Sequence, residues 1–148
     1  MKFKTVHKKL DAAMKLDEDK GWFFAIDNGV KEEIVQLNTI DQLFDKGIDS
    51  LNKSLGKYAN TTIELYKKPK GQKYSNITLK DTGAFYRSFT VEVTKDSIKI
   101  NANPIKEDNN LFDDFGAEIV GLTTQNRMRV SEMILNNIII YVKKQLQI

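Results

Sequence analysis

The stretch LKDTGAFYRSFTVEV, Leu79–Val93, carries the most ordered local pattern in the chain. It begins with two residues that can cap a helix and a glycine, Asp81–Gly83, and continues into a short turn that contains Phe85 and Phe89. The pattern then changes to the alternation typical of a strand. We therefore predict one helical turn, Ala84–Phe89, directly before a β-strand, and the stretch contains no catalytic residue.

A β-hairpin is predicted directly after this turn. Residues 90–94 and residues 98–102 both alternate between apolar and polar side chains, and the polar segment KDS between them forms a short turn. One face of this hairpin is expected to be buried. The apolar positions on that face are Val91, Val93, Ile98 and Ile100.

Helices are predicted on both sides of the hairpin. Apolar residues recur at helical spacing over residues 4–17, starting from Phe3, and over residues 30–46, and a short helix is expected over about 60–66. Asp27 or Asn28 is expected to cap the helix 30–46, and Gly47 to end it. The aromatic cluster GWFFAIDNG between the first two helices fits either a strand or a helical turn.

A long C-terminal helix is predicted from Thr123 or Thr124 to about residue 146, within the segment 124–147. Its apolar residues form two adjacent stripes, which together make a face wider than a two-layer helix requires. We expect two surfaces to cover this face, the sheet and a neighbouring subunit. The stripes are Val130, Ile134, Ile138 and Tyr141 in the first, and Leu135, Ile139, Val142 and Leu146 in the second.

The expected fold is one α+β domain over residues 1–148. A small antiparallel sheet, made of the hairpin 90–94/98–102 and a further strand, is predicted to pack against the long C-terminal helix and the helix 30–46. Residues 1–27, the first helix and the aromatic segment, could form an arm. The chain has no cysteine, and its longest apolar run is far shorter than the roughly 20 residues of a membrane span, so a soluble, non-secreted protein without membrane partners is expected.

No catalytic, cofactor-binding or metal site is predicted. The only histidine, His7, lies in a lysine-rich helix without the partners of a triad or a metal site. A group of carboxylates near the end of the sheet could do acid–base work, hold a cation or form a subunit contact, but a solvated loop is favoured. These carboxylates are Asp108, Asp113, Asp114 and Glu118.

The densest basic stretch is YKKPKGQKY, in which four lysines lie between two tyrosines. Basic residues interleaved with aromatic ones can follow a nucleic-acid backbone. A solvated loop after a helix C-terminus is the favoured interpretation, because lysines also complement the helix dipole there. The four residues are Lys67, Lys68, Lys70 and Lys73.

Several segments, in this order and spacing, resemble the virion-morphogenesis and tail-completion proteins of tailed bacteriophages. They are LFDKGIDSLNKSLGKYANTTIELYKK, ITLKDTGAFYRSFTVEV, IKINA and LFDDFGAEIVGLT, within residues 37–125. Those proteins carry a Thr-Gly-x-Leu-x-x-Ser motif, which reads Thr82–Ser88 here, and an aromatic-Gly pair, which Phe115-Gly116 matches. Phe85 departs from the usual aliphatic residue, and residues 1–36 have no counterpart in the pattern.

The resemblance implies that the motif is a structural joint. Asp81 or Thr82 would cap the short helix, and Gly83 would permit a tight approach. The two phenylalanines one turn apart would lie under the sheet, and Ser88 would bond back to the preceding turn instead of acting as a nucleophile.

The resemblance also implies a function and partners. It indicates a non-enzymatic structural protein of a tailed bacteriophage or prophage, found in the virion and, during assembly, in the cytoplasm of the bacterial host. Copies would form a head-to-tail ring at the head–tail junction, through which DNA passes, with other head and tail proteins as neighbours. The loop Lys67–Lys73, the loop Asp108–Glu118 and the exposed stripe of the last helix are the expected interface pieces.

Two alternatives remain at this point. A small nucleic-acid-associated protein would use the Lys67–Lys73 loop and bind with strong salt dependence. A carboxylate-based hydrolase would depend on Asp113 and Asp114, but no base, nucleophile or oxyanion motif accompanies these acids.

Overall fold

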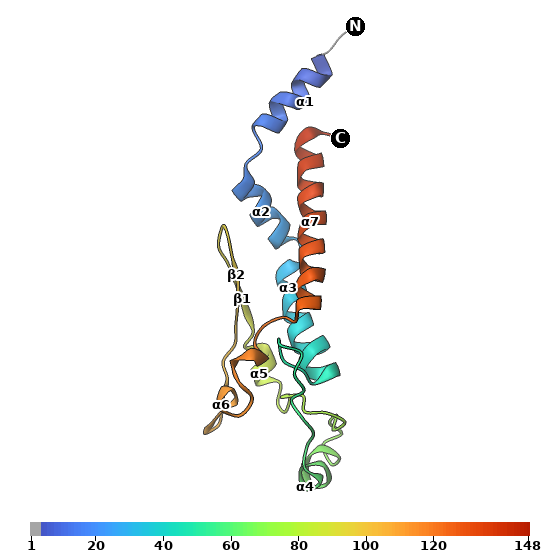
Figure 1. Cartoon of the computed structure of the whole chain (residues 1–148), viewed down its shortest axis with the longest axis vertical. Coiled ribbons are helices and arrows are strands. Elements are labelled where there is room, and N and C mark those ends of the chain that lie inside the picture. The colour runs from blue at the N-terminus through green and yellow to red at the C-terminus, as the bar shows by residue number, and fades with distance from the viewer. Residues whose placement is uncertain (1–3) are drawn as a thin grey trace.

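The computed structural model describes residues 4–148, which form an elongated α+β molecule (Figure 1). The helices are α1 (Lys4–Met14), α2 (Glu18–Asp27), α3 (Val30–Gln36), α4 (Asn60–Thr62), α5 (Ala84–Arg87), α6 (Leu111–Phe115) and α7 (Thr124–Leu146). Helices α3 and α4 continue without a break into more widely wound π-helical turns, Leu37–Lys46 and Ile63–Lys67, and a 3₁₀ turn spans Ala117–Ile119. The strands are β1 (Thr90–Val93), β2 (Ile98–Asn101), β3 (Ile105–Lys106) and β4 (Asn109–Asn110).

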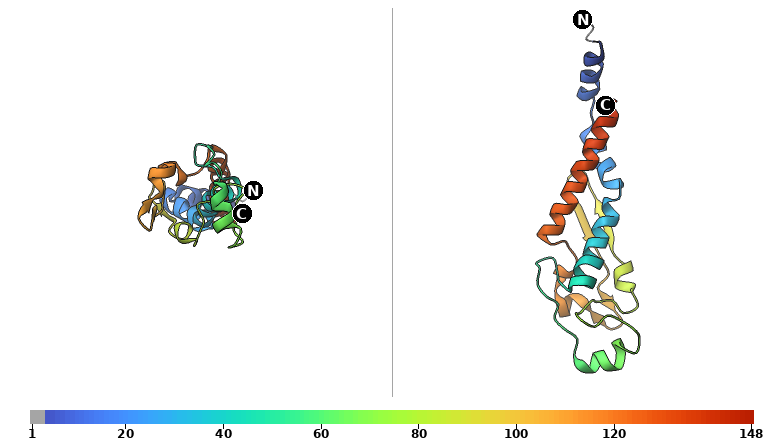
Figure 2. Two further views of the ribbon diagram at one scale, coloured as in Figure 1. Left: turned by 90° about the horizontal axis from the view of Figure 1, so that it is seen from below. Right: turned by 90° about the vertical axis from the view of Figure 1, so that its right-hand side faces the viewer.

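The long helices run along the molecule and the hairpin lies against them. Figure 1 shows α7 beside α2 and α3, the β1–β2 hairpin on one side, and α4 at the end of the molecule opposite both termini. Seen along the long axis, the same elements form a compact cross-section (Figure 2). The predicted packing of an antiparallel hairpin on the helix 30–46 and on a long C-terminal helix is confirmed.

The strands form two separate antiparallel pairs instead of one larger sheet. β1 pairs with β2 as the predicted hairpin, with Val91 opposite Ile100 and Val93 opposite Ile98. β3 pairs with β4 in a small second sheet, so in residues 4–148 no further strand extends the hairpin, and that part of the prediction is wrong. Pro104, which has no backbone N–H to continue the β2 ladder, lies between the two pairs.

Two apolar clusters form the core. In the first, side chains from α2, α3 and α7 meet the inner face of the hairpin; its buried members are Ile26, Val30, Ile34, Leu37, Leu122 and Val130. The second lies at the foot of the hairpin, around α5 and α6; its buried members are Leu43, Phe85, Phe89, Leu111 and Ile119. Together they hold the hairpin between the long helices and the short ones.

The aromatic segment GWFFAIDNG resolves into helix α2. Its buried side faces α7, where a Cβ on Gly21 would lie 3.2 Å from the ring of Tyr141, so the absence of a side chain lets the two helices approach closely. The indole Nε1 of Trp22 donates a hydrogen bond to the carbonyl of Thr94 (2.7 Å). α2 is therefore tied both to α7 and to the hairpin.

The start of α3 differs from the prediction, whereas its end agrees. Neither Asp27 nor Asn28 caps α3; the N-cap is Gly29, at φ 85°, with no side-chain hydrogen bond. Because α2 extends through Asp27, the chain must turn sharply before α3, and glycine adopts the required left-handed conformation without strain. At the other end Gly47 stops the helix at φ 61°, as predicted.

Two amide side chains of the helical turns Leu37–Lys46 bind the extended segment that precedes α7. The first is Asn38, whose Nδ2 donates to the carbonyl of Ile119 (3.0 Å) and whose Oδ1 accepts from the backbone N–H of Gly121 (2.7 Å). Asn38 is fully buried, and its bond to Ile119 is buried while its bond to Gly121 is partly buried.

The second is Gln42, one helical turn later. Its Nε2 donates to the carbonyl of Gly121 (2.8 Å), and its Oε1 accepts from the backbone N–H of Thr123 (2.9 Å). Gln42 is also fully buried. Asn38 and Gln42, which we call the amide clamp, therefore bind residues 119–123 as a neighbouring β-strand would.

The amide clamp also fixes the start of α7. Thr123 caps the helix by accepting from the backbone N–H of Asn126 (3.2 Å), and Asn126 Nδ2 donates to both Gln42 Oε1 and Asp41 Oδ2 (2.9 Å each). Burial of Asp41 works to raise the pKa of its carboxyl, but hydrogen bonds from Asn126 and Lys46 outweigh that effect and leave the pKa below its ordinary value.

Gln42→Ala is expected to lower the free energy of unfolding by about 2–4 kcal/mol, because it leaves the buried N–H of Thr123, the amide of Asn126 and the partly buried carbonyl of Gly121 without this partner. Gln36→Ala, at an exposed position one and a half turns earlier, is the matched control and should change it by less than about 0.5 kcal/mol. Urea unfolding followed by circular dichroism measures both. Equal values for the two variants would contradict the role given to the amide clamp.

Candidate functional site

The Thr82-Gly83 joint sets the start of α5. The hydroxyl of Thr82, and not the carboxylate of Asp81, accepts from the backbone N–H of Ala84 (3.2 Å). Gly83 is the N-cap residue and has φ 82°, a conformation that favours glycine. A Cβ at Gly83 would meet only the flexible end of Arg87 (2.8 Å), so backbone conformation, and not the expected tight approach, accounts for the glycine.

The side chains after the joint point into the second apolar cluster. Phe85 and Phe89 are both buried, and their rings pack edge to face with centroids 5.2 Å apart. Ser88 Oγ donates to the carbonyl of Phe85 (2.6 Å) and accepts from the backbone N–H of Asn103 (2.9 Å), which follows β2. The serine hydroxyl is thus engaged on both sides and links α5 to the foot of the hairpin.

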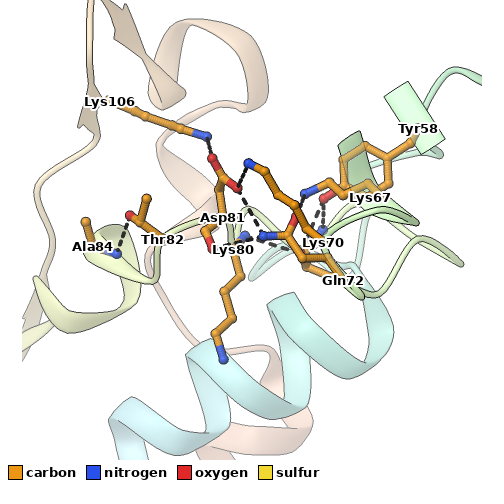
Figure 3. A network of polar contacts seen from close by, with 10 residues as sticks. Tyr58, Lys67, Lys70, Gln72, Lys80, Asp81, Thr82, Ala84 and Lys106 are labelled. Atoms are coloured by element: carbon orange, nitrogen blue, oxygen red, sulfur yellow. Dashed lines mark hydrogen bonds and ion pairs between the residues drawn. The ribbon is translucent and has the colours of Figure 1, made fainter. Parts of the chain in front are cut away.

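Asp81 is the centre of a polar network that joins three segments (Figure 3). Its Oδ1 accepts from Gln72 Nε2 (3.1 Å) and from Lys70 Nζ (3.3 Å), and its Oδ2 accepts from Lys106 Nζ (3.2 Å). Gln72 also donates to the backbone carbonyl of Asp81 (3.1 Å). The hydrogen bonds from Gln72, Lys106 and Lys70 outweigh burial and hold the pKa of this carboxyl well below its usual range.

The lysines of the basic stretch contact the chain itself. Lys67 is buried; its ammonium donates to Gln72 Oε1 (3.1 Å) and lies 4.6 Å from the centre of the Tyr58 ring. Lys68 pairs with Glu64 one turn earlier (2.5 Å), which raises the pKa of the lysine.

Lys73 caps the C-terminal end of the helix that stops at Gly47. Its ammonium donates to the carbonyls of Phe44 (2.8 Å) and Asp45 (2.9 Å), which are left without helical partners there. Together with Lys70 on Asp81, the four lysines each have an anionic or carbonyl partner within the chain. Their arrangement is that of a loop fastened to the body, and it does not favour the nucleic-acid alternative.

The acidic residues lie exposed around β4 and α6. Asp108, Asp113, Asp114 and Glu118 are all exposed, and Asn109 Nδ2 donates to Asp114 Oδ2 (2.5 Å). Within residues 4–148 no three His, Cys, Asp or Glu side chains come together in a way that could hold a metal ion.

The aromatic-Gly pair, Phe115-Gly116, lies between Asp114 and Glu118. Phe115 packs against the second apolar cluster, and Gly116 ends α6 with φ 85°. A Cβ there would lie 2.5 Å from Glu118 Oε2. The pair thus forms the turn that leads from α6 into the segment bound by the amide clamp.

Exposed apolar side chains lie along α7 and α1. Along α7, Leu135 and Ile139 of the second predicted stripe are 57% and 42% exposed, whereas Val142 and Leu146 of the same stripe are half-buried. Ile140, which belongs to neither predicted stripe, is 55% exposed. Beside them a groove of about 490 Å³, which we call the open groove, runs between α7 and the hairpin. Its lining includes Trp22, Ile98, Ile134, Leu135 and Ile138.

Helix α1 adds a second apolar face. It has no buried residue, and Val6, Leu10 and Met14, spaced by four, are 62%, 54% and 71% exposed. The predicted contribution of Phe3 lies outside the described residues. No helix in the described part of the chain has the length and hydrophobicity needed to cross a membrane.

Comparison with protein-family models, with curated proteins and with solved structures finds no match.

The sequence did not predict which residues bind Asp81 or that Trp22 lines the open groove. Gln72 and Lys106 lie 9 and 25 positions from Asp81, and no local pattern connects them. Trp22 lines the open groove, although its segment could not be assigned to a helix or a strand from its pattern. The exposure of the second α7 stripe was signalled by the excess width of the apolar face.

Asp81→Asn is expected to lower the free energy of unfolding by about 1–2 kcal/mol at pH 7, since the charged network is lost and its lysines remain partly solvated. The pKa of Asp81 is lower in the folded chain, so its contribution is complete well above the unfolded value of about 4 and declines as the pH falls below it. The difference between wild type and Asp81→Asn should therefore narrow from pH 7 to pH 3.

Urea unfolding at both pH values measures this difference. Asp113→Asn, at an exposed carboxylate near the same end of the molecule, is the control and should have an effect of less than about 0.5 kcal/mol at pH 7. A difference for Asp81→Asn that stays constant or widens toward pH 3 would argue against the network.

Proposed function

We propose that this chain is a non-enzymatic structural subunit of a tailed bacteriophage or prophage, which completes the tail or joins it to the head as part of a ring. Two observations support the proposal. The motif segments within residues 37–125 resemble tail-completion proteins, and each motif residue has a structural role in the fold, with Ser88 engaged in hydrogen bonds on both sides.

The observation that carries the proposal is the uncovered apolar surface of α7, the open groove and α1. Monomeric proteins rarely leave large contiguous apolar patches in water, and such patches mark interaction sites. Helices α1 and α7 lie along the long axis of this narrow molecule (Figure 1), and both carry exposed apolar side chains. A subunit that packs side by side with copies of itself would cover them.

A ring requires a heterologous contact, in which two different surfaces of the subunit meet. The chain offers two apolar surfaces of different shape, the convex face of α1 and the open groove. The exposed acidic residues 108–118 provide charged contacts at the far end of the molecule. Neighbouring head and tail proteins would bind the two ends of the ring, and DNA would pass through its centre without sequence-specific contacts.

Disruption of this gene in the phage or prophage that carries it is expected to yield particles in which filled heads and tails are not joined, and expression in trans should restore infectivity. Electron microscopy of lysates and plaque counts measure these outcomes. Normal, infectious virions from the disrupted phage would contradict the proposal.

The purified chain is expected to form a closed oligomer of one defined mass at high concentration, and Leu135→Asp should shift it toward monomer. Asn136→Asp, an exposed polar neighbour on the same helix, is the control and should leave the oligomer unchanged. Native mass spectrometry and light scattering measure the mass. A strict monomer in both low and physiological salt, with no effect of either variant, would count against a ring.

A further inference from the structure

We propose that helix α1 of one copy places its apolar face in the open groove of the next copy, so that each subunit provides one helix and receives another. This inference rests on the proposed ring and names the contact that would close it. It assigns a binding partner, a second copy of this chain, to two surfaces that are unpaired in the single chain.

Helix α1 is built as a segment that requires a partner. An isolated helix of 11 residues is only marginally stable in water, and α1 buries no side chain of its own. Its apolar residues Val6, Leu10 and Met14 recur every four positions and form one continuous face. In Figure 1 the helix projects beyond the C-terminal end of α7, away from the rest of the molecule.

The side of α1 that faces its own α7 is the polar one. Lys4, Thr5, Lys8, Lys9 and Ala12 line a hollow together with Gln145, Leu146 and Gln147 at the end of α7. These α1 positions lie on the opposite side of the helix from Val6 and Leu10. The apolar face therefore points away from the chain's own body and is presented to another molecule.

The open groove has the dimensions and lining to receive such a helix. It shares Trp22 and Ile138 with a second hollow of about 380 Å³ that continues along α7 past Tyr141 and Val142. The lining positions on α7 run from Arg127 to Val142, which at about 1.5 Å per residue is roughly 23 Å. The 11 residues of α1 span roughly 16 Å on the same scale.

The charges of the two surfaces are complementary. α1 carries Lys4, Lys8 and Lys9 against the single acid Asp11. The second hollow is bordered by three consecutive exposed acids, Asp17–Asp19, against the single base Lys95. Among residues 4–148, no ion pair engages these acids or the lysines of α1. Opposite charges at the rim of an apolar contact set its orientation.

The chain has no cysteine, so engineered cysteines report this contact without background. Leu10→Cys and Leu135→Cys are prepared as separate variants, one of them isotopically labelled, and mixed under mild oxidation. Because a disulfide forms only when the two Cα atoms come within about 7 Å, mixed dimers indicate that α1 of one copy lies on α7 of another. The control mixture replaces Leu135→Cys with Asn136→Cys, the adjacent exposed position.

We expect at least about tenfold more mixed dimer from the Leu10/Leu135 pair than from the control pair. Equal yields from the two mixtures would overturn the inference. A chain that carries both Leu10→Cys and Leu135→Cys should form little internal disulfide in dilute solution, and efficient internal closure would show instead that α1 folds back onto its own groove.

A second pair of variants tests the apolar face directly. Leu10→Asp should weaken self-association by about tenfold or more, and Thr5→Asp, which adds the same charge on the opposite side of α1, should not. Both positions are exposed in the single chain, so circular dichroism should show unchanged folding. Equal association of the two variants would overturn the inference.

The remaining outcomes separate this inference from the proposed function. A ring that forms equally well with Leu10→Asp would leave the function standing and remove the α1 contact. Mixed disulfides between the purified variants, together with normal virions from the phage in which the gene is disrupted, would support the α1 contact and rule out the proposed function. Binding of wild type, but not Leu10→Asp, to anionic vesicles, without mixed disulfides, would assign α1 to a membrane surface and overturn the inference.

Discussion

The buried hydrogen bonds between a helix and an extended segment hold this molecule together. Asn38 and Gln42 lie four residues apart, a rise of about 6.0 Å along a helix, while alternate residues of an extended chain repeat every 6.6 Å or so. The near match lets two consecutive helical turns bind Ile119, Gly121 and Thr123 through side-chain amides, where a sheet would use a neighbouring strand. No buried side-chain polar atom among residues 4–148 is left without a partner, so this dry polar contact stabilises the fold instead of straining it.

The position of α7 follows from that contact, and the exposed surface follows from the position of α7. With its first turn fixed at Thr123 and Asn126, α7 can meet α2, α3 and the hairpin along only one side. The other side, with Leu135 and Ile139, faces water in the single chain. The charged residues of the loops, in contrast, make contacts within the chain. Asp81 and Lys73 bind their loops to the body of the molecule. Apolar residues are thus left exposed along α7, while the charged loops are bound to the body of the fold.

The sequence supports prediction where structure is set by neighbouring residues. The hairpin alternation, the stop at Gly47 and the start of the last helix at Thr123 or Thr124 are local signals, and the structure has them where they were expected. The amide clamp could not be predicted, because Asn38 and Gln42 look like ordinary polar positions on a helix and their partners lie about eighty residues away. Of the candidate site, the local motif Thr82–Ser88 was recognisable. The partners of the four lysines Lys67, Lys68, Lys70 and Lys73 could not be recognised from the sequence, because most of these contacts depend on how the chain folds back on itself.

Hydrogen exchange at the backbone N–H groups of Gly121 and Thr123 tests most directly whether Asn38 and Gln42 hold the segment before α7. Both precede a helix in a segment without regular secondary structure, where amide hydrogens ordinarily exchange quickly. If they donate to buried side-chain amides, their exchange should be as slow as that of the amides around Val130 in the core of α7, and hydrogen–deuterium exchange followed by NMR measures each site. Exchange of Gly121 and Thr123 as fast as that of the exposed hairpin turn at Lys95 and Asp96 would show that the helix does not hold this segment.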